Sequence, residues 1–325
     1  MAQDSSQASI VTVSVHALSC GHFTLPEHQF VKPSTLEARR TVPSLAFLIQ
    51  HKSQTGKVTR ILFDLGLRRD LERYPLPIQK HTQNRRPITT EPDVVENLAR
   101  GGLSPDDIDY IIYSHQVHWD HVGEPRDFPT STFIIGHGSL ALLAGSSAKY
   151  RGGHSFFESD LLPAARKIEL SDPLVEDIKT ESPKAKPKTP NFSVPWRQHP
   201  SFALPHTLDI FGDGSVLIVN APGHLPGHIN LLTRTSEQHY VYLGGDACHD
   251  RRLLNGEKQI GEWTDTEGHV CCIHVDREAA EETIRRIREL EEKGVEVVFA
   301  HDIEWEEEPK NKGRFFDTEK CSTTE

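Results

Sequence analysis

Short runs of β-branched and aromatic residues recur along the chain, and each run is bounded by polar or turn-forming residues. Such runs are typical of buried or half-buried strands. Residues 45–50 and 58–63 flank the turn Ser53-Gln54-Thr55-Gly56, which predicts a hairpin. The full set of predicted strands is residues 10–16, 45–50, 58–63, 108–113, 132–135, 216–220, 230–233, 240–243 and 295–300.

Other segments show the period and the end signals of helices. The longest, residues 277–293, stands between Asp276, a helix-capping residue, and Gly294, a residue that favours the end of a helix. Strands and helices that alternate in this way predict an α/β protein. The predicted helices are residues 92–100, 138–144 and 277–293, with a helical turn at 104–107.

Several segments lack a periodic pattern and are expected to be irregular. One of them contains Phe23 and Phe30, which either form a wall of a substrate pocket or pin the loop to the core. Another contains His154 and Phe156, two candidates for substrate contact. The irregular segments are residues 20–30, 68–87 on the surface, 145–163, a flexible linker at 171–200, and a loosely packed tail at 304–325.

Length and charge limit the function before any motif is considered. A chain of 325 residues can bury a large core. Its net charge of −11 leaves no basic surplus for nucleic acid or an anionic membrane. The five cysteines form no C-x-x-C pair, and residues 1–9 lack the pattern of a signal peptide. No run reaches the ~20 apolar residues of a membrane helix. A cytoplasmic protein is expected.

The densest cluster of polar side chains follows the strand predicted at 108–113. Residues 114–121 read Ser-His-Gln-Val-His-Trp-Asp-His. Imidazole and carboxylate groups are the ligands expected of zinc, and also of iron or manganese. Crowded at the end of a buried strand, these groups need a cation to satisfy them. A metal site is therefore predicted, and the alternative is a histidine-rich surface loop without metal.

Four further motifs stand at the ends of predicted strands. Alone, each is a weak signal, and an aspartate before a turn such as Asp64 is a common turn cap. Together and in one order they are far less frequent by chance. These motifs are residues 63–66 (Phe-Asp-Leu-Gly), 222–228 (Pro-Gly-His-Leu-Pro-Gly-His), 244–247 (Gly-Gly-Asp-Ala) and 300–302 (Ala-His-Asp).

The five motifs resemble those of the metallo-β-lactamase superfamily, and most of all its N-acyl homoserine lactonase-like branch. The resemblance covers roughly residues 45–302. It implies a four-layer αββα sandwich, a single domain over residues 1–325 in which two similar halves are joined near 171–200. In such a fold the strand-end loops of both halves meet at one edge.

The first motif departs from the family pattern by one residue. The resemblance places the first histidine at 116, where this chain has Gln116, while the histidine stands at 115. Either Gln116 bulges out of the loop, or the first ligand is lost or replaced by the amide oxygen. Because Ser114 precedes His115 at a strand end, as in the family, we favour the bulge.

Carried over position by position, the resemblance implies two divalent metal ions, expected to be Zn²⁺, with iron or manganese as alternatives. His115, His118 and His224 would hold one ion. Asp120, His121 and His301 would hold the other, and Asp246 would be shared. Asp64 and His228 would contact the metal ligands and orient them without binding the ions themselves.

Asp120 and His249 are the predicted catalytic residues. Asp120 would shuttle a proton, and His249 would contact the substrate carbonyl or the leaving group, as a tyrosine at that offset does in the lactonases. An alternative is that His249 has no chemical role.

The resemblance implies a hydrolase that opens a cyclic ester or amide of a small molecule. A thioesterase of the glyoxalase II type is the alternative within the same class. If Gln116 breaks the first site, a single-iron dioxygenase or a non-catalytic binding protein is expected instead. The oligomeric state stays open.

Overall fold

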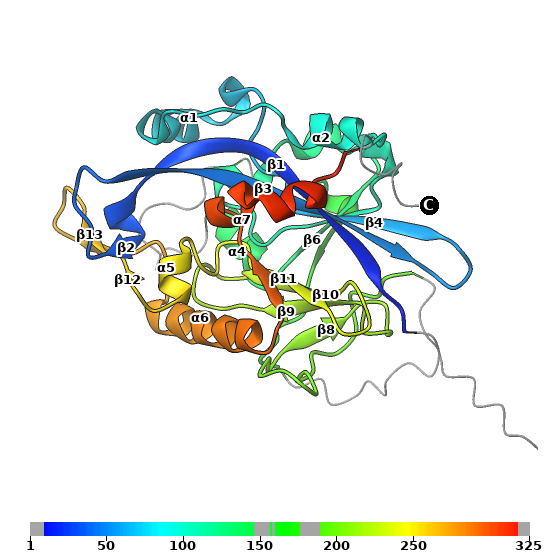
Figure 1. The fold of residues 1–325 in the computed structure, drawn as a ribbon. Helices are drawn as coiled ribbons and strands as arrows, with labels where there is room; N and C mark the ends of the chain where they lie inside the picture. The colour runs from blue at the N-terminus through cyan, green and yellow to red at the C-terminus, as the bar shows by residue number, and fades with distance from the viewer. Residues whose placement is uncertain (1–9, 146–156, 158–159, 176–188, 318–325) are drawn as a thin grey trace, which may run out of the picture.

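Two β-sheets form the centre of the molecule (Figure 1). The computed structural model describes residues 10–145, 157, 160–175 and 189–317. The six-stranded sheet has the order β1-β3-β4-β5-β6-β7, and the five-stranded sheet has the order β15-β11-β10-β9-β8. The strands of the first sheet are β1 (Val13–Pro26), β3 (Arg39–Lys52), β4 (Val58–Phe63), β5 (Tyr110–Ile112), β6 (Thr132–Ile135) and β7 (Lys167–Glu169). Those of the second are β8 (Thr207–Asp209), β9 (Val216–Asn220), β10 (Ile229–Arg234), β11 (Tyr240–Leu243) and β15 (Glu296–Val298).

Alternation along the strands sends neighbouring side chains into two different cores. Phe47 and Ile49 of β3 join the core that lies between the sheets, where they meet Ile218 and Leu231 of the second sheet. Leu48, between them in sequence, belongs to the other core cluster. Because a strand has a period of two, each sheet carries an apolar set on both faces. Both faces of each sheet therefore need a covering layer.

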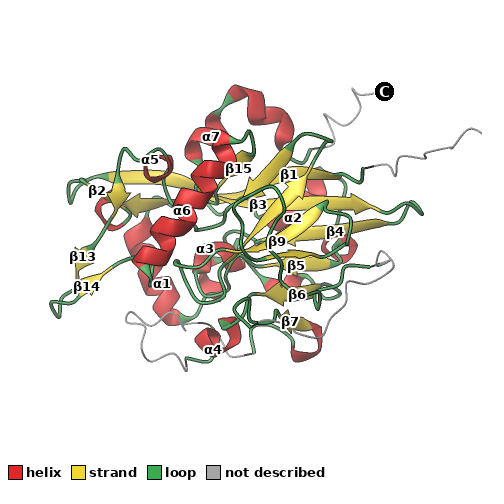
Figure 2. Ribbon diagram, turned by 90° about the horizontal axis from the view of Figure 1, so that it is seen from below, coloured by secondary structure: helices red, strands yellow, loops and turns green. Residues whose placement is uncertain are grey.

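Helices cover the outer faces of the sheets. α2 (Val94–Arg100) contacts β1, and α6 (Arg277–Glu292) contacts β15. Figure 1 shows α2 above the strands and α6 below them, and Figure 2, viewed from below, shows α6 lying across the strands. Ile284, Ile287 and Leu290 are the buried aliphatic residues of α6. The predicted four-layer αββα sandwich is confirmed.

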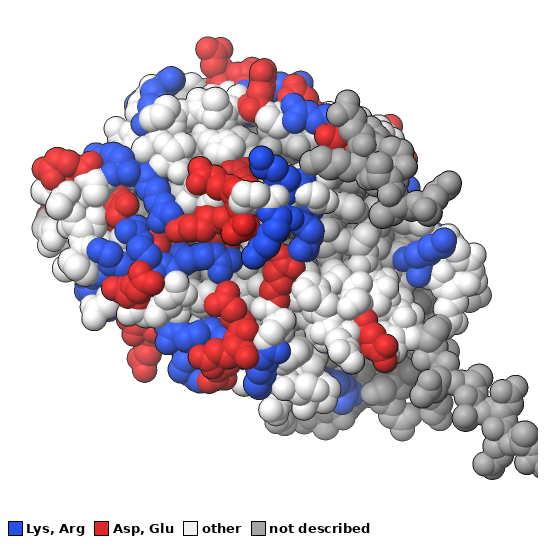
Figure 3. All heavy atoms as spheres, in the orientation of Figure 1, with Lys and Arg blue, Asp and Glu red and all other residues white. Residues whose placement is uncertain are grey.

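The outer side of α6 carries alternating charges. Arg285 pairs with Glu282 at 2.7 Å and with Glu289, and Arg277 pairs with Glu281 at 2.8 Å. Figure 3 shows acidic and basic side chains intermixed on this face. Exposed pairs of this kind contribute little to stability, because water and salt screen them. The stability of the helix therefore comes from its buried face.

The remaining elements are short. Two small sheets pair β12 with β2 and β13 with β14. In the described part of the chain, no helix is long and apolar enough to cross a membrane. The other helices and strands are α1 (Leu76–Thr82), α3 (Trp119–Val122), α4 (Ser139–Leu143), α5 (Arg251–Leu254), α7 (Ile303–Glu307), β2 (Val31–Lys32), β12 (Gln259–Ile260), β13 (Trp263–Thr264) and β14 (Val270–Cys271).

The prediction of an irregular loop at residues 20–30 was wrong for its first half. β1 continues to Pro26 because its backbone pairs with β3 along the whole length. A register shift between Ser19 and His22, with Gly21 at φ 95°, bends the strand without ending it. The sequence there reads as a turn because glycine and polar residues interrupt the apolar pattern.

Two further expectations need correction. Residues 68–87 were expected on the surface, yet the Arg68 side chain is fully buried and its Nε donates to the Gly123 carbonyl at 2.8 Å. The tail was expected to pack loosely, yet Trp305 is buried between the sheets. Both side chains find partners that only the fold brings near.

The linker and the segment 145–163 are described only in part. His154 and Phe156 lie outside the described residues, as do residues 176–188 of the predicted linker. The described end of the linker is ordered against the rest of the protein. Phe192 is buried between the sheets, and Trp196 Nε1 donates to the Ser171 carbonyl at 2.9 Å.

Candidate metal centre

The loops that follow four strands meet at one edge of the two sheets. Backbone hydrogen bonds join these loops directly: Ile229 N donates to the Ser114 carbonyl at 3.0 Å, and Ala300 N donates to the Gly245 carbonyl at 3.1 Å. Gly245 has φ 48°, and a Cβ on it would lie 2.7 Å from the Ser114 Cβ. The two halves of the chain touch at this edge, and only glycine at position 245 allows so close an approach.

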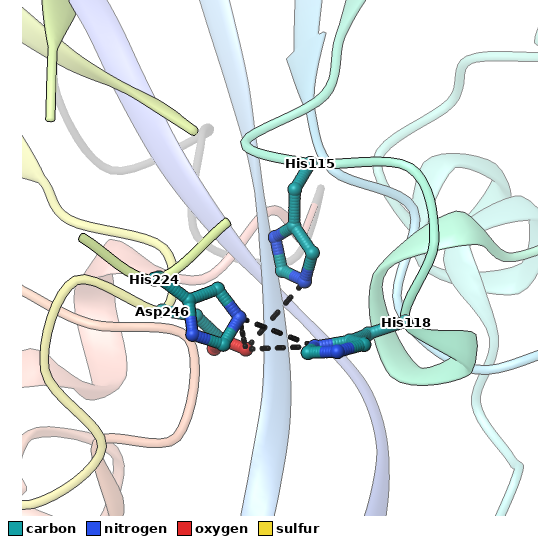
Figure 4. Close-up of side chains that lie close together, drawn as sticks. All are labelled: His115, His118, His224 and Asp246. Atoms are coloured by element: carbon teal, nitrogen blue, oxygen red, sulfur yellow. Dashed lines mark hydrogen bonds and ion pairs between the residues drawn. The ribbon is translucent and has the colours of Figure 1, made fainter. Parts of the chain in front are cut away.

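A first group of ligand atoms surrounds one oxygen of Asp246. Asp246 Oδ2 lies 3.6 Å from His115 Nε2, 3.8 Å from His118 Nδ1 and 3.3 Å from His224 Nε2. The two nitrogens of His118 and His224 are 3.2 Å apart. Figure 4 shows the three rings converging on the carboxylate, with His115 and His118 on one loop and His224 on another. All four donor atoms lie within 4.8 Å of one another, a spacing that suits one metal ion.

A second group lies on the other oxygen of the same carboxylate. Asp246 Oδ1 is 3.0 Å from His121 Nε2 and 3.1 Å from His301 Nε2. Asp120 Oδ2 lies 3.4 Å from the same nitrogen of His301. The donor atoms of Asp120, His121 and His301 also lie within 4.8 Å of one another. Asp246 thus stands between two groups, as a bridging ligand does.

Asp64 fixes the orientation of the first loop. Its carboxylate accepts hydrogen bonds from Ser114 N and Ser114 Oγ, both at 2.7 Å, and from His121 Nδ1 at 2.8 Å. With its Nδ1 held in this way, His121 turns Nε2 toward Asp246, and although burial opposes them, the two carboxylates raise the pKa of His121. The Ser114 hydroxyl lies 3.1 Å from His115 Nδ1 and can accept a hydrogen bond from it, which leaves Nε2 of His115 facing the first group. Outer partners of this kind set the tautomer of a metal-binding histidine.

Two more histidines are held by backbone atoms. His301 Nδ1 donates to the Pro43 carbonyl at 2.8 Å, which leaves Nε2 facing the second group. His228 Nε2 accepts from Asp246 N at 3.2 Å, so its Nδ1 carries the proton and donates to the Ala221 carbonyl, also at 3.2 Å. His228 therefore positions the backbone of Asp246 and contributes no nitrogen to either group.

The donor set fits a pair of metal ions. Among the described residues, His115 Nε2, His121 Nε2 and Asp246 Oδ1 are buried and make no hydrogen bond. His121 Nε2 and Asp246 Oδ1 lie within ion-pair distance, yet their geometry does not suit a hydrogen bond. Buried polar atoms without partners are costly, and a cation in each of the two groups would satisfy these atoms.

The protonation of the rings is consistent with this fit. Burial lowers the pKa of His115 and of His224 well below the usual value, so both imidazoles are neutral, as metal ligands must be. Burial alone would also lower the pKa of His301, but Asp246 and Asp120 outweigh it and raise the pKa to about 9. Metal binding to the second group therefore displaces a proton.

The extra residue of the first motif does not displace the histidine. His115 Nε2 lies 3.6 Å from Asp246 Oδ2, within the group of donor atoms around that carboxylate. Gln116 is buried, and in the described part of the chain its Nε2 has no hydrogen-bond partner. That the loop accommodates Gln116 as a bulge stays a prediction.

Two histidines extend the cluster beyond the seven predicted ligands. His249 Nε2 lies 3.2 Å from Asp246 Oδ2, and its ring stacks on His301 with centroids 5.8 Å apart. His274 was missed by the sequence reasoning, because it belongs to no motif. Its donor atom lies within 4.8 Å of those of His224 and His249, and neither of its ring nitrogens has a partner among the described residues.

A cavity of about 400 Å³ opens above these groups. His118, Asp120, Asp246, His249, His274 and His301 all line it. Much of the remaining wall is apolar, and it includes Phe23 and Phe30, which are both buried and at the cavity. A small molecule with an apolar body fits this enclosure, with its polar end at the ligand groups.

Comparison with known proteins identifies relatives along most of the chain. Residues 39–301 match the family model of the metallo-beta-lactamase superfamily. A cytochrome P450 monooxygenase named mpaDE, from Penicillium roqueforti, is 31% identical over 287 aligned residues, which cover 81% of this chain and 30% of that protein. Gamma-lactamase FDB1 from Fusarium pseudograminearum is 29% identical over 253 residues, which cover 73% of this chain and 54% of that protein. The chain thus spans about a third to a half of these relatives.

Solved structures support the same fold. An N-acyl homoserine lactone hydrolase, with N-hexanoyl-L-homoserine bound at its catalytic metal center, matches with a TM-score of 0.61 and 21% identity, over 91% of this chain and 96% of that one. N-acyl homoserine lactonases also stand among the relatives by sequence. The lactonase-like branch predicted from the motifs is therefore confirmed.

Proposed function

Since this chain belongs to the metallo-beta-lactamase superfamily, we propose that it is a metal-dependent hydrolase that opens a cyclic ester or amide. One observation carries the proposal: two groups of buried imidazole and carboxylate ligands share Asp246 at the base of an apolar cavity. Relatives named as a lactamase and as lactonases support the class of bond.

The proposed ligands divide as the sequence predicted. His115, His118 and His224 would hold one ion, Asp120, His121 and His301 would hold the other, and Asp246 would bind both. When bound, two divalent ions would lower the pKa of a water molecule and polarise the carbonyl of the substrate. Zinc suits the nitrogen-rich donor set.

The chain's own residues bind the ring and move the proton. Water adds to the carbonyl carbon, and the ring bond to oxygen or nitrogen then breaks. Asp120 lines the cavity, so its carboxylate can accept the proton that the water loses and pass it to the departing atom. His249 lines the cavity with its Nε2 3.2 Å from Asp246 Oδ2, so it can form a hydrogen bond to the substrate there.

Metal analysis combined with a substrate panel tests the proposal. The purified protein should contain about two divalent ions per chain. It should hydrolyse γ-lactones or γ-lactams faster than acyl thioesters of the same size. A single iron per chain with oxidative turnover would replace the proposal by a dioxygenase. A thioester preferred over every ring would replace it by a thioesterase of the glyoxalase II type.

A further inference from the structure

The mouth of the cavity is basic, although the protein is acidic overall. A second hollow of about 500 Å³ adjoins the first and shares Gln29, His81, Arg85 and Trp263 with it. Arg39 also lines this second hollow. Among the described residues that line it, none is acidic. A molecule that enters the cavity therefore passes two arginines.

Arg85 is a half-buried cation with an incomplete set of partners. Its Nη2 donates to Gln29 Oε1 at 3.3 Å, and within the described residues it forms no ion pair. Arg40 and Arg251, which are similarly half-buried, each pair with two carboxylates. Arginine is rarely withdrawn from water unless it is paired. Arg85 thus has donors free for a ligand.

The surroundings of Arg85 favour an anion. Burial lowers the pKa of Arg85, Asp120 opposes this effect, and Arg39 adds a smaller lowering. Arg39 donates only to the carbonyl oxygens of Leu36 and Ala38 among the described residues, so it adds positive charge without neutralising any. The carboxylates that line the cavity, Asp120 and Asp246, belong to the proposed metal ligands. An anionic ligand would offset the charge that remains at the mouth.

We propose that Arg85 binds a carboxylate of the substrate, so that the substrate is a cyclic ester or amide with an apolar body and an acidic substituent. This inference rests on the proposed function, because it identifies the substituent that the cyclic substrate carries away from the ring that is opened. A guanidinium and a carboxylate form two parallel hydrogen bonds in one plane. Arg85 lines both hollows, whereas Arg39 lines only the outer one, so one guanidinium faces a ligand in the cavity, and one carboxylate balances its charge.

The apolar walls between the two ends determine the rest of the substrate. Trp119 and Trp263 line the cavity together with Phe30 and Val270. Flat, aromatic side chains of this kind pack well against an unsaturated or aliphatic ring system. The substrate thus spans the distance from the ligand groups to Arg85 with its apolar part.

Paired substrates and a matched control variant test the proposal. The probes are an aryl-substituted γ-lactone that carries a carboxylate and the methyl ester of the same lactone. In Arg85→Gln, the KM for the acid should rise about 10- to 100-fold, the change expected when a charged hydrogen bond is lost. The KM for the ester should stay within about twofold of the wild type. Arg85→Lys should restore part of the preference.

Arg86→Gln is the control, because Arg86 is the exposed neighbour and lines neither hollow. It should leave both KM values unchanged. If Arg85→Gln weakens the acid and the ester equally, Arg85 has only a structural role beside Gln29, and the proposal is overturned. A phosphorylated lactone preferred over the acid would also overturn it.

The anion site can also be tested if the proposed function is wrong. If the wild type hydrolyses neither lactone, binding of an uncleavable cyclic ether that carries the same carboxylate is measured by calorimetry. A tenfold weaker affinity in Arg85→Gln would still support the anion site. Equal affinities would overturn it.

Discussion

The two ligand groups differ in how firmly the protein holds them. In the second group, His121 donates to Asp64 and His301 donates to the Pro43 carbonyl, so both rings are fixed by strong acceptors. In the first group, His115 has only the Ser114 hydroxyl, and among the described residues His224 Nδ1 has no partner. Outer partners raise the affinity of a histidine for metal. The second group should therefore bind its ion more tightly.

Asp246→Ala should have the largest effect, because it removes the ligand that both groups share. We expect loss of both ions and of all hydrolysis, measured by metal analysis and turnover. Asp213→Ala is a matched control, since this carboxylate bonds His51 at 2.9 Å and takes part in neither group. A variant of Asp246 that kept one tightly bound ion would show that the groups are independent.

Asp64→Asn should weaken the second group more than the first, because His121 bonds Asp64 directly, whereas His115 is reached only through Ser114. Asn tolerates the left-handed backbone of Asp64, whose φ is 61°. The amide is a poorer acceptor for His121, so affinity for one of two ions should fall about 10- to 100-fold. Competition with a chelator measures the two affinities separately. If the other ion is the one that weakens, the ranking of the two groups is reversed.

His274→Asn should have a smaller effect, limited to the first group. The His274 segment is tied to the His224 loop, since Val275 N donates to the His224 carbonyl at 3.0 Å. His274 is the unpartnered ring next to His224, with centroids 5.3 Å apart, and a water between them would complete the outer contact. We expect about a threefold to tenfold loss of affinity, less than the roughly 10- to 100-fold loss expected for a direct outer partner. No change in the chelator titration would exclude this role.

His22→Gln lies outside both groups and should affect only stability. The hydrogen bond that His22 Nε2 donates to the Glu306 carboxylate raises the pKa of His22, although burial opposes it. A raised pKa stabilises the fold below the unfolded value of about 6.5, and this contribution is lost as pH rises through the folded pKa. The variant should lower the melting temperature at about pH 5.5 and leave it unchanged near pH 9. An equal loss at both pH values would contradict the ion pair.

The strands and the long helix were predictable because their signals are local. The run before Asp64 and the cap at Asp276 needed no knowledge of distant contacts. β1 beyond Ser19 was missed, because its continuation depends on pairing with β3. The burial of Arg68 was missed because its partners, the Gly123 and Arg73 carbonyls, are brought near only by the fold.

The seven proposed ligands were predictable as a set because each follows an apolar run in a fixed order. His274 and Arg85 were not, since neither stands in a motif. Both reach the cavity from segments outside the two sheets, and that placement is set by tertiary packing. Sequence patterns therefore indicated the chemistry of the site better than its selectivity.

The contact between Gly245 and Ser114 has a consequence for the biosynthesis of the protein. Ligands on both sides of this contact range from His115 to His301, so a growing polypeptide exposes its first histidines long before the last one leaves the ribosome. If the proposed ligand sets hold, the first group is complete only after Asp246 has been translated, and the second only after His301. An unfinished chain would then bind a metal ion only through incomplete sets of ligands.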